Sequence, residues 1–540
     1  MKKMLLLMVA AFTATTTFAQ FGDFGTEEPT WTKTISAVEK ASDAYVEAPV
    51  VITSQGDVIK TGVFSQEFTF AGETLEPIAK SAYIVKYDKE GNEVWANALR
   101  GAATITAMTL DEEGNIYVAG RFADKVIVTS TDDNSVEIEG MEDQTDQVSG
   151  FILAYDAAGK LLSQKTVVPS YDFELFMTAL ENEGFYLAES KFVVNKIVVA
   201  NGKVYVSANY MGNNTLDDVV LEGKIFDMFA MKSFCFDLNN FAVIQLDKDL
   251  TNAKLLANVN TSDDALYGEL QMEPQALKFA LDGEDVYVAW TGWGDVTMAT
   301  EKGTQNFSFS YAEGEEGGRE HGFVVANVTT GAAQEFRAPL EKSEAGFFTI
   351  ANMEVAEGKL YIGGTYIGAL AFDNQLTSTG ACDAFMAALN TTDLTVEWAK
   401  TSGIDEGEAN KFNEAALSYV EVEDGAVGMV VNAIDMSTKE ISQSIAFLYI
   451  PDYDYFATME MPFKITSGSA SVAGAVVNSN VGTESTLIYF ADEEFTQGIE
   501  TIDNGQSTIG NSAIFNLQGQ RVNKAQKGVF IQKGQKFVVK

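Results

Sequence analysis

A short strand-like segment that recurs along the chain constrains the fold more than any other feature. Each copy joins a Gly or acidic turn to alternating apolar and aromatic residues, as in residues 114–120, which read Gly-Asn-Ile-Tyr-Val-Ala-Gly. β-branched and aromatic residues that alternate and stop at such turns indicate strands and hairpins. The clear copies are residues 56–62, 114–120, 202–208, 284–290 and 358–364, and weaker copies lie near 425–432 and 474–478.

A second pattern follows each copy, and it consists of an apolar strand, a tight turn and another strand. In the first unit the apolar strand is residues 82–88, and its equivalents start at Phe151, Phe241, Phe323, Phe385, Ala446 and Leu487. Each unit therefore holds about four strands, with a long connection between the second and the third. Seven such units in a row predict an all-β chain and a seven-bladed β-propeller. Separate β-sandwich domains are the alternative, but sandwiches do not repeat a four-strand unit seven times.

The two ends of the repeat array predict how the ring closes. The outer strands of the first and fifth units carry Trp at residues 95 and 398, whereas the seventh unit ends at Phe495 without such a strand. Residues 31–34 read Trp-Thr-Lys-Thr and match residues 398–401 at three of four positions. We therefore expect residues 31–35 to pair with residues 486–490, so that the N-terminal strand closes the propeller and makes unfolding more cooperative.

The first residues have the pattern of a signal peptide. Lys2 and Lys3 precede an apolar stretch, residues 4–12, that is too short to span a bilayer. Residues 17–19, Thr-Phe-Ala, form a cleavage site of the small-x-small type. We expect cleavage near Ala19 and a mature protein that is secreted or displayed at the cell surface, and the sequence predicts no transmembrane segment.

The charge balance changes sharply near the C-terminus. Residues 504–540 contain six Lys or Arg and no Asp or Glu, whereas the whole chain has a net charge of −41. Such a switch in composition indicates a boundary. The predicted organisation is a signal peptide over residues 1–19, a propeller over 20–495, a linker over 496–511 and a small C-terminal β segment over 512–540.

Two resemblances follow from these motifs. The units resemble the bacterial SBBP propeller repeat, best in residues 358–403, where residues 382–389 read Cys-Asp-Ala-Phe-Met-Ala-Ala-Leu before Trp398. This resemblance implies a propeller fold and no shared catalytic residues. Residues 514–522, 528–531 and 536–540 resemble a truncated C-terminal sorting domain of Bacteroidetes type IX secretion. That resemblance implies that the C-terminal segment interacts with the secretion machinery.

Residue counts and net charge disfavour several function classes. With 77 Asp and Glu against 36 Lys and Arg, the field repels phosphate backbones and argues against nucleic-acid binding. His321 is the only histidine, and it precedes a repeat strand, so a Ser-His-Asp arrangement is not expected. A His/Cys zinc cluster is excluded because the chain has one His and two Cys.

The two cysteines are expected to be free thiols. Cys235 and Cys382 precede the same strand in the third and fifth units, so a whole unit stands between them. Their Cα atoms should therefore lie beyond the ~7 Å limit for a disulfide. Titration of the denatured, unreduced protein should give two thiols, and a count of zero would show that the assigned repeat register is wrong.

The long second connections are predicted to gather on one face of the propeller, because alternate turns of an antiparallel blade lie on opposite sides. Long loops in compact domains are more often functional than idle. The candidate ligand-binding residues on this face are Trp290, Trp293 and Tyr210, whose rings offer flat apolar surface. Local packing is the alternative for Trp290 and Trp293.

Acidic residues of the same connections are candidate ligands for Ca²⁺, which takes carboxylate and carbonyl oxygens. They are Asp132, Asp133, Glu315 and Glu316. Neither cluster has the spaced Asp-x-Asp-x-Asp-Gly pattern, so solvated loops are the alternative. No other cofactor is expected.

These features favour a binding module over an enzyme. The expected partner is a protein or a glycan at the cell surface, bound on the face of the long connections. The alternative is a carbohydrate-active enzyme that uses two carboxylates at the funnel of the propeller, one with a pKa raised by burial.

Overall fold

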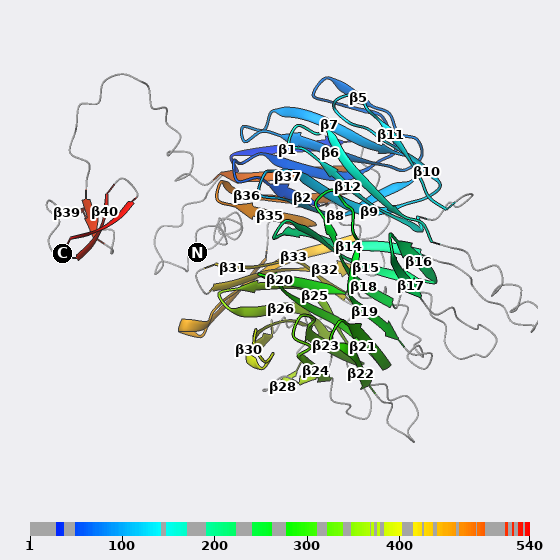
Figure 1. Ribbon diagram of the computed structural model, residues 1–540. Coiled ribbons are helices and arrows are strands. Elements are labelled where there is room, and N and C mark those ends of the chain that lie inside the picture. Colours follow the sequence, from blue (N-terminus) through cyan, green and yellow to red (C-terminus); the bar gives the residue numbers. More distant parts are fainter. Residues whose placement is uncertain are drawn as a thin grey trace, which may run out of the picture. The chain divides into compact units, whose positions relative to one another are not determined.

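The computed structural model describes most of residues 29–491 and four short strands near the C-terminus (Figure 1). The described ranges are 29–36, 49–141, 147–169, 191–222, 240–261, 277–309, 321–337, 347–367, 369–371, 375–377, 383–401, 414–423, 426–435, 440–460, 464–481, 483–491, 514–516, 521–522, 528–532 and 535–539. The proposed signal peptide and linker, both cysteines, Glu315 and Glu316 lie outside them. The chain divides into two compact parts, Met1–Phe495 and Thr496–Lys540.

The larger part is nearly all β, and its strands form four-stranded antiparallel units in chain order. The units, numbered one to seven, are β2 (Val50–Ile52), β3 (Val58–Phe64), β6 (Ser81–Tyr87) and β7 (Glu93–Arg100); β8 (Ala103–Leu110), β9 (Ile116–Phe122), β12 (Ser149–Tyr155) and β13 (Leu161–Val167); β14 (Lys191–Ala200), β15 (Lys203–Met211), β18 (Asn240–Asp247) and β19 (Lys254–Thr261); β20 (Lys278–Asp282), β21 (Asp285–Thr300), β23 (His321–Asn327) and β24 (Ala333–Arg337); β25 (Phe347–Ala356), β26 (Lys359–Ile367), β29 (Asp383–Asn390) and β30 (Val396–Thr401); β31 (Glu414–Glu423), β32 (Ala426–Asp435), β33 (Glu440–Ile450) and β34 (Tyr455–Glu460); and β35 (Ser467–Ser471), β36 (Gly474–Val481), β37 (Glu484–Ala491) and β1 (Trp31–Ser36). A single 3-10 turn, η2 (Pro451–Tyr453), interrupts the described strands.

The first strands of consecutive units contact one another along the whole array. They are β2, β8, β14, β20, β25, β31 and β35, and β35 in turn contacts β2. Figure 1 shows the orange strands β35 and β36 beside the blue strand β2. Four-stranded antiparallel sheets that repeat in this way give the protein β-propeller architecture.

The hydrophobic core lies between neighbouring units. Along β9, Ile116 and Val118 pack with Ile59 of unit one, whereas Tyr117 and Ala119 pack with Val206 of unit three. Successive side chains of a strand point to opposite faces, so both faces of the middle strands are covered. All seven residues of β3, β6 and β12 are accordingly buried.

The N-terminal strand β1 is the fourth strand of unit seven. It pairs antiparallel with β37, from Trp31 opposite Tyr489 to Ser36 opposite Glu484. The indole of Trp31 stacks on Tyr489 at 5.0 Å between ring centroids, and its Nε1 donates to the carbonyl of Lys89 in unit one at 3.0 Å. Trp95 makes the equivalent bond from unit one to Ala157 of unit two at 3.3 Å. Residues 31–35 therefore pair with the strand that the sequence predicted.

Tight turns built on an Asp form the third connection of unit one and the first connection of unit two. The Asp88 carboxylate accepts the backbone N–H of Asn92 at 2.7 Å, and Asp111 accepts that of Asn115 at 2.8 Å. A glycine precedes each of these asparagines, Gly91 before Asn92 and Gly114 before Asn115. Their φ angles are 80° and 82°, in the left-handed region that favours Gly. The Asp and Gly spacing in the sequence thus specifies these turns.

The second connections of units one to five carry extra strands. They are β4 (Phe68–Phe70) with β5 (Glu73–Leu75), β10 (Lys125–Val128) with β11 (Val136–Glu139), β16 (Asn213–Leu216) with β17 (Val219–Glu222), the end of β21 with β22 (Gly303–Phe309), and β27 (Ala369–Ala371) with β28 (Gln375–Thr377). β10 pairs with β7, and β21 pairs with β19, so two of these hairpins extend the sheet of the preceding unit.

The smaller part is one four-stranded antiparallel sheet in the order β39-β38-β40-β41. Its strands are β38 (Ile514–Asn516), β39 (Arg521–Val522), β40 (Gly528–Gln532) and β41 (Gln535–Val539). Across the described residues of both parts, no helix is long and apolar enough to cross a membrane.

Candidate interaction surface

Two of the three candidate ligand-binding rings are buried. Trp290 is 1% exposed and packs edge-on against Phe307, with 5.6 Å between ring centroids. Tyr210 is fully buried, and its hydroxyl lies 2.6 Å from Oδ1 of Asn258. The prediction that these rings offer flat surface to a ligand is therefore wrong, because both fill the core between units. Trp293 lies in β21 opposite His321, and its side chain is outside the described structure.

The register of the repeat explains why Tyr210 is buried. Tyr210 forms the last pair between the second and third strands of its unit, opposite Asn240. Phe64 holds this position opposite Ser81, and Phe122 holds it opposite Ser149. An aromatic residue opposite a small polar one thus recurs at this point of the unit. Alignment of the units predicts that Tyr210 is buried, since Phe64 and Phe122 hold the same position and both are buried.

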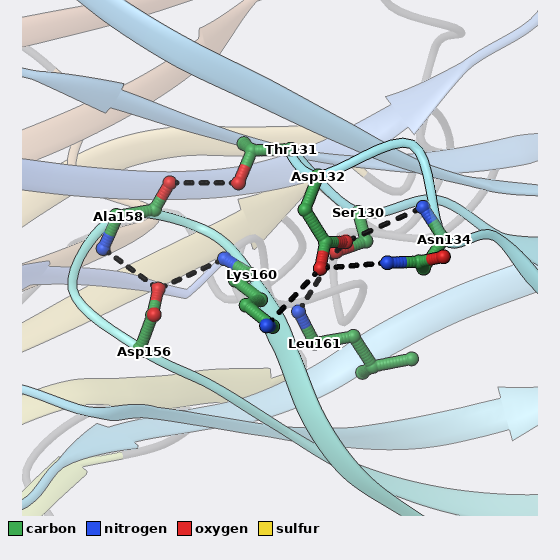
Figure 2. Close-up of polar contacts among 8 residues, drawn as sticks. All are labelled: Ser130, Thr131, Asp132, Asn134, Asp156, Ala158, Lys160 and Leu161. Carbon is green, nitrogen blue, oxygen red and sulfur yellow. Dashed lines mark hydrogen bonds and ion pairs between the residues drawn. The ribbon is translucent and has the colours of Figure 1, made fainter.

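The Asp132 carboxylate is engaged by groups of the protein (Figure 2). Ser130 Oγ donates to its Oδ1 at 2.6 Å, Asn134 Nδ2 donates to its Oδ2 at 2.9 Å, and Lys160 Nζ lies 3.3 Å from Oδ2. The hydrogen bonds from Ser130 and Asn134 lower the pKa of the Asp132 carboxyl. These contacts fix the turn after β10 against the tight turn of residues 156–160.

The contacts of Asp132 differ from those of a Ca²⁺ ligand, the role that the sequence suggests for Asp132 and Asp133. Both oxygens of Asp132 already accept protein donors, and Asp133 occupies a left-handed turn position with φ of 62°. Within the described residues, no group of three or more His, Cys, Asp or Glu side chains is placed to hold a metal ion. The Asp132 carboxylate therefore orders its loop through contacts with Ser130, Asn134 and Lys160.

A polar groove of about 420 Å³ lies beside the outer strand of unit two. Its volume falls within the ~300–1,000 Å³ of ligand pockets. Three elements line it, namely β11, β13 and the turn between β16 and β17. The lining residues are Glu137, Ile138, Glu139, Gln164, Lys165, Thr166 and Asp217.

The charged groups of this groove form two ion-paired sets. Lys165 pairs with Asp217, and this contact lowers the pKa of the Asp217 carboxyl. Lys125 lies 3.1 Å from Glu139 and 3.5 Å from Glu137, and the bond to Glu139 raises the pKa of the Lys125 ammonium. The contact with Lys165 therefore favours the ionised form of Asp217.

The sequence predicts a site on the second connections but does not predict this groove. Glu137 and Glu139 follow the acidic cluster at residues 132–134 and form strand β11, whereas Gln164 and Lys165 lie in a fourth strand for which the sequence predicts no site. Their meeting depends on how the hairpin of unit two docks on unit one. No local motif encodes that docking, so only the alternating Val-Glu-Ile-Glu of residues 136–139 could have indicated a strand there.

A second polar cluster lies buried between units seven and one. Lys60 is 0% exposed, and its ammonium donates to Oδ1 of Asn478 at 2.5 Å. Ser485 Oγ donates to the same oxygen at 3.0 Å. Burial lowers the pKa of Lys60 from 10.5 to about 7. The other six units carry an aliphatic or Met side chain at this position of the second strand: Val118, Val206, Val288, Ile362, Met429 and Val477.

Comparison with known proteins finds similarity only at low levels. No family model matches the sequence. An uncharacterized WD repeat-containing protein of Acanthamoeba polyphaga mimivirus is 28% identical over 126 residues, which are 21% of this chain and 9% of that protein. This chain therefore matches less than a tenth of that relative.

Among solved structures, the chain is similar to quinohemoprotein alcohol dehydrogenase from Comamonas testosteroni, with a TM-score of 0.38, 12% identity, and coverage of 83% of this chain and 75% of that one. The β-propeller domain of the Trilobed protease from Pyrococcus furiosus has a TM-score of 0.35 and 8% identity, with coverage of 81% of this chain and 91% of that one. The WD40 domain of SCAP from fission yeast has a TM-score of 0.32 and 10% identity, with coverage of 86% of this chain and 99% of that one. Similarity at this level carries no argument about function, and the propeller architecture rests on the strand pairing above.

Proposed function

We propose that this protein is a secreted or cell-surface propeller of seven blades, closed by its N-terminal strand, that binds a protein or a glycan and catalyses no reaction. The observation that carries the binding proposal is the polar groove of about 420 Å³ at the second connections. The SBBP-like units and the sorting-like C-terminal segment support the extracellular location that the signal-peptide pattern suggests.

The closure of the ring is supported by contacts between the first and last units. Ile52 N donates to Ser469 Oγ at 3.3 Å, and Ser471 Oγ donates to the carbonyl of Thr53 at 2.9 Å. One hydrophobic cluster contains Val50 of β2 together with Trp31 of β1 and other residues of both units. A ring closed in this way holds its surface connections on a rigid scaffold, which is the usual basis of a loop-borne binding site.

The groove fits binding better than acid–base chemistry. A glycosidase of the usual kind needs one carboxyl with a raised pKa as its general acid. Lys165 instead lowers the pKa of Asp217, and Lys125 lies within 3.5 Å of Glu137 and Glu139. The contact with Lys165 favours a charged Asp217 carboxylate, which recognises a ligand by hydrogen bonds and charge.

The groove variant Glu139→Ala/Lys165→Ala tests this proposal. It should weaken binding of any ligand found on a glycan array or a peptide array by at least about tenfold, because it removes two polar groups that line the groove. The measurement is titration calorimetry with the best ligand from either array.

A matched control is Glu90→Gln/Glu112→Gln, which changes two exposed residues of the tight turns. It should leave the affinity unchanged. Loss of binding in this control, with full binding in the groove variant, would place the ligand on the opposite face and refute the proposal.

A further inference from the structure

The fourth strands of the units differ in whether a further strand pairs with their outer edge. The hairpin β10–β11 adds to β7 of unit one, and β21 with β22 adds to β19 of unit three. In unit two, β13 is the last strand of its sheet among the described pairings. The nearby hairpin β16–β17 contacts β13 but forms a separate two-stranded sheet. Among the described strands, unit two thus has no counterpart of the fifth strand that units one and three possess.

The groove lies along this edge of β13. Gln164, Lys165 and Thr166 are consecutive in β13 and all line it, as do the consecutive residues 137–139 of β11. Consecutive side chains of a strand point to opposite faces, so a groove that all three line runs beside the strand itself. β11 is likewise the last strand of its own sheet. Edge strands expose unpaired backbone N–H and C=O groups, which are a template for another strand.

The charge of the lining indicates the kind of chain that fits. It contains the carboxylates Glu137, Glu139 and Asp217 and the ammonium of Lys165. Lys125 pairs with both glutamates, so three carboxylates face two ammonium groups and negative charge is in excess. Glu137 and Glu139 are both exposed, so an incoming cation can reach them. The chain as a whole carries −41, which attracts basic partners over a longer range.

We propose that the groove takes an extended basic peptide, which adds as a fifth strand to the edge of β13 with its lysine or arginine side chains toward the carboxylates. The proposal rests on the binding function assigned to this same groove, and it names the partner class. Main-chain hydrogen bonds to β13 would supply affinity, and the carboxylates of β11 would select basic side chains.

The test uses the full-length protein and four synthetic heptapeptides. One alternates Lys and Val, and one alternates Glu and Val. The other two repeat the Lys-Val sequence with N-methyl groups on either all odd or all even residues. The Lys-Val peptide should bind and slow amide exchange within residues 161–167. The Glu-Val peptide should bind at least about tenfold more weakly, since several exposed charge pairs change from attractive to repulsive.

N-methylation gives the signature of strand addition. A peptide paired along one edge uses the N–H groups of alternate residues only, so one N-methylated peptide should lose binding and the other should keep it. Glu137→Gln/Glu139→Gln should weaken the Lys-Val peptide about fivefold or more. Glu90→Gln/Glu112→Gln should leave its affinity unchanged.

Several results would overturn strand addition. Equal binding of both N-methylated peptides would mean electrostatic adsorption, and slowed exchange only at other edge strands would mean a different site. If a glycan or a folded protein binds the groove and the peptide does not, the proposed function stands and strand addition fails. If no ligand responds to groove variants, the proposed function fails as well.

Discussion

The variant Trp31→Ala should lose about 3–5 kcal/mol of stability, because it removes a large buried ring between the last and first units. Trp31 stacks on Tyr489, contacts Tyr87 of unit one at 5.7 Å between ring centroids, and donates to Lys89. Deletion of residues 20–37 should lower the melting temperature further, since it also exposes the edge of β37. Differential scanning calorimetry of the mature protein measures both changes.

Thr32→Ala is the matched control for this experiment. Thr32 lies in the same strand as Trp31, but its side chain is exposed, so its loss should change stability by less than about 0.5 kcal/mol. A melting curve that is the same for wild type and the deletion would contradict a structural role for β1. A deletion that melts in two separate steps would instead support the expectation that β1 makes the ring cooperative.

Much of the fold could be read from the sequence because the repeat carries it. The alternation in residues 114–120 and the Asp and Gly spacing of the turns are local signals, and each specifies its strand or turn independently. The match between residues 31–34 and 398–401 also predicts one pairing between distant parts of the chain. Both segments are the fourth strand of a unit, so each pairs with the third strand of that unit.

The site was harder to read because its residues are set by packing between units. Trp290 interrupts the repeat with a large ring, which suggested a surface role, yet the structure buries it against Phe307. The acidic residues near 132 suggested a cation, yet Ser130, Asn134 and Lys160 engage Asp132. The groove depends on the docking of one unit's hairpin on its neighbour, and no short sequence pattern reports that.

Lys60 shows a departure from the repeat that the sequence did display. Its second-strand position is aliphatic or Met in the other six units. The Lys60 side chain faces unit seven, where Oδ1 of Asn478 accepts a hydrogen bond from its Nζ. Burial is the one cause of its lowered pKa, with no charged partner contributing. Among the described residues Lys60 has no carboxylate partner, and a buried ammonium without one costs stability.

Lys60→Met should therefore stabilise the protein at pH 7 and below. The pKa of Lys60 is about 7 in the folded state against 10.5 unperturbed, so folding favours the neutral amine. The cost of this lysine is fully present below pH 7, shrinks as the pH rises, and vanishes above about 10.5. At one pKa unit per ~1.4 kcal/mol, the maximum gain is on the order of 5 kcal/mol, reduced by the lost bond to Asn478.

The measurement is the free energy of unfolding in urea, for wild type and Lys60→Met, at steps from pH 6 to pH 10. Other titrating groups are common to both proteins, so the difference between them isolates Lys60, and it should fall steadily above pH 7. Lys86→Met is the matched control, because Lys86 is also largely buried but pairs with Asp57 at 2.9 Å. That variant should lose stability where Lys60→Met gains it. A difference for Lys60→Met that stays constant with pH would mean that the lysine remains charged in the folded protein.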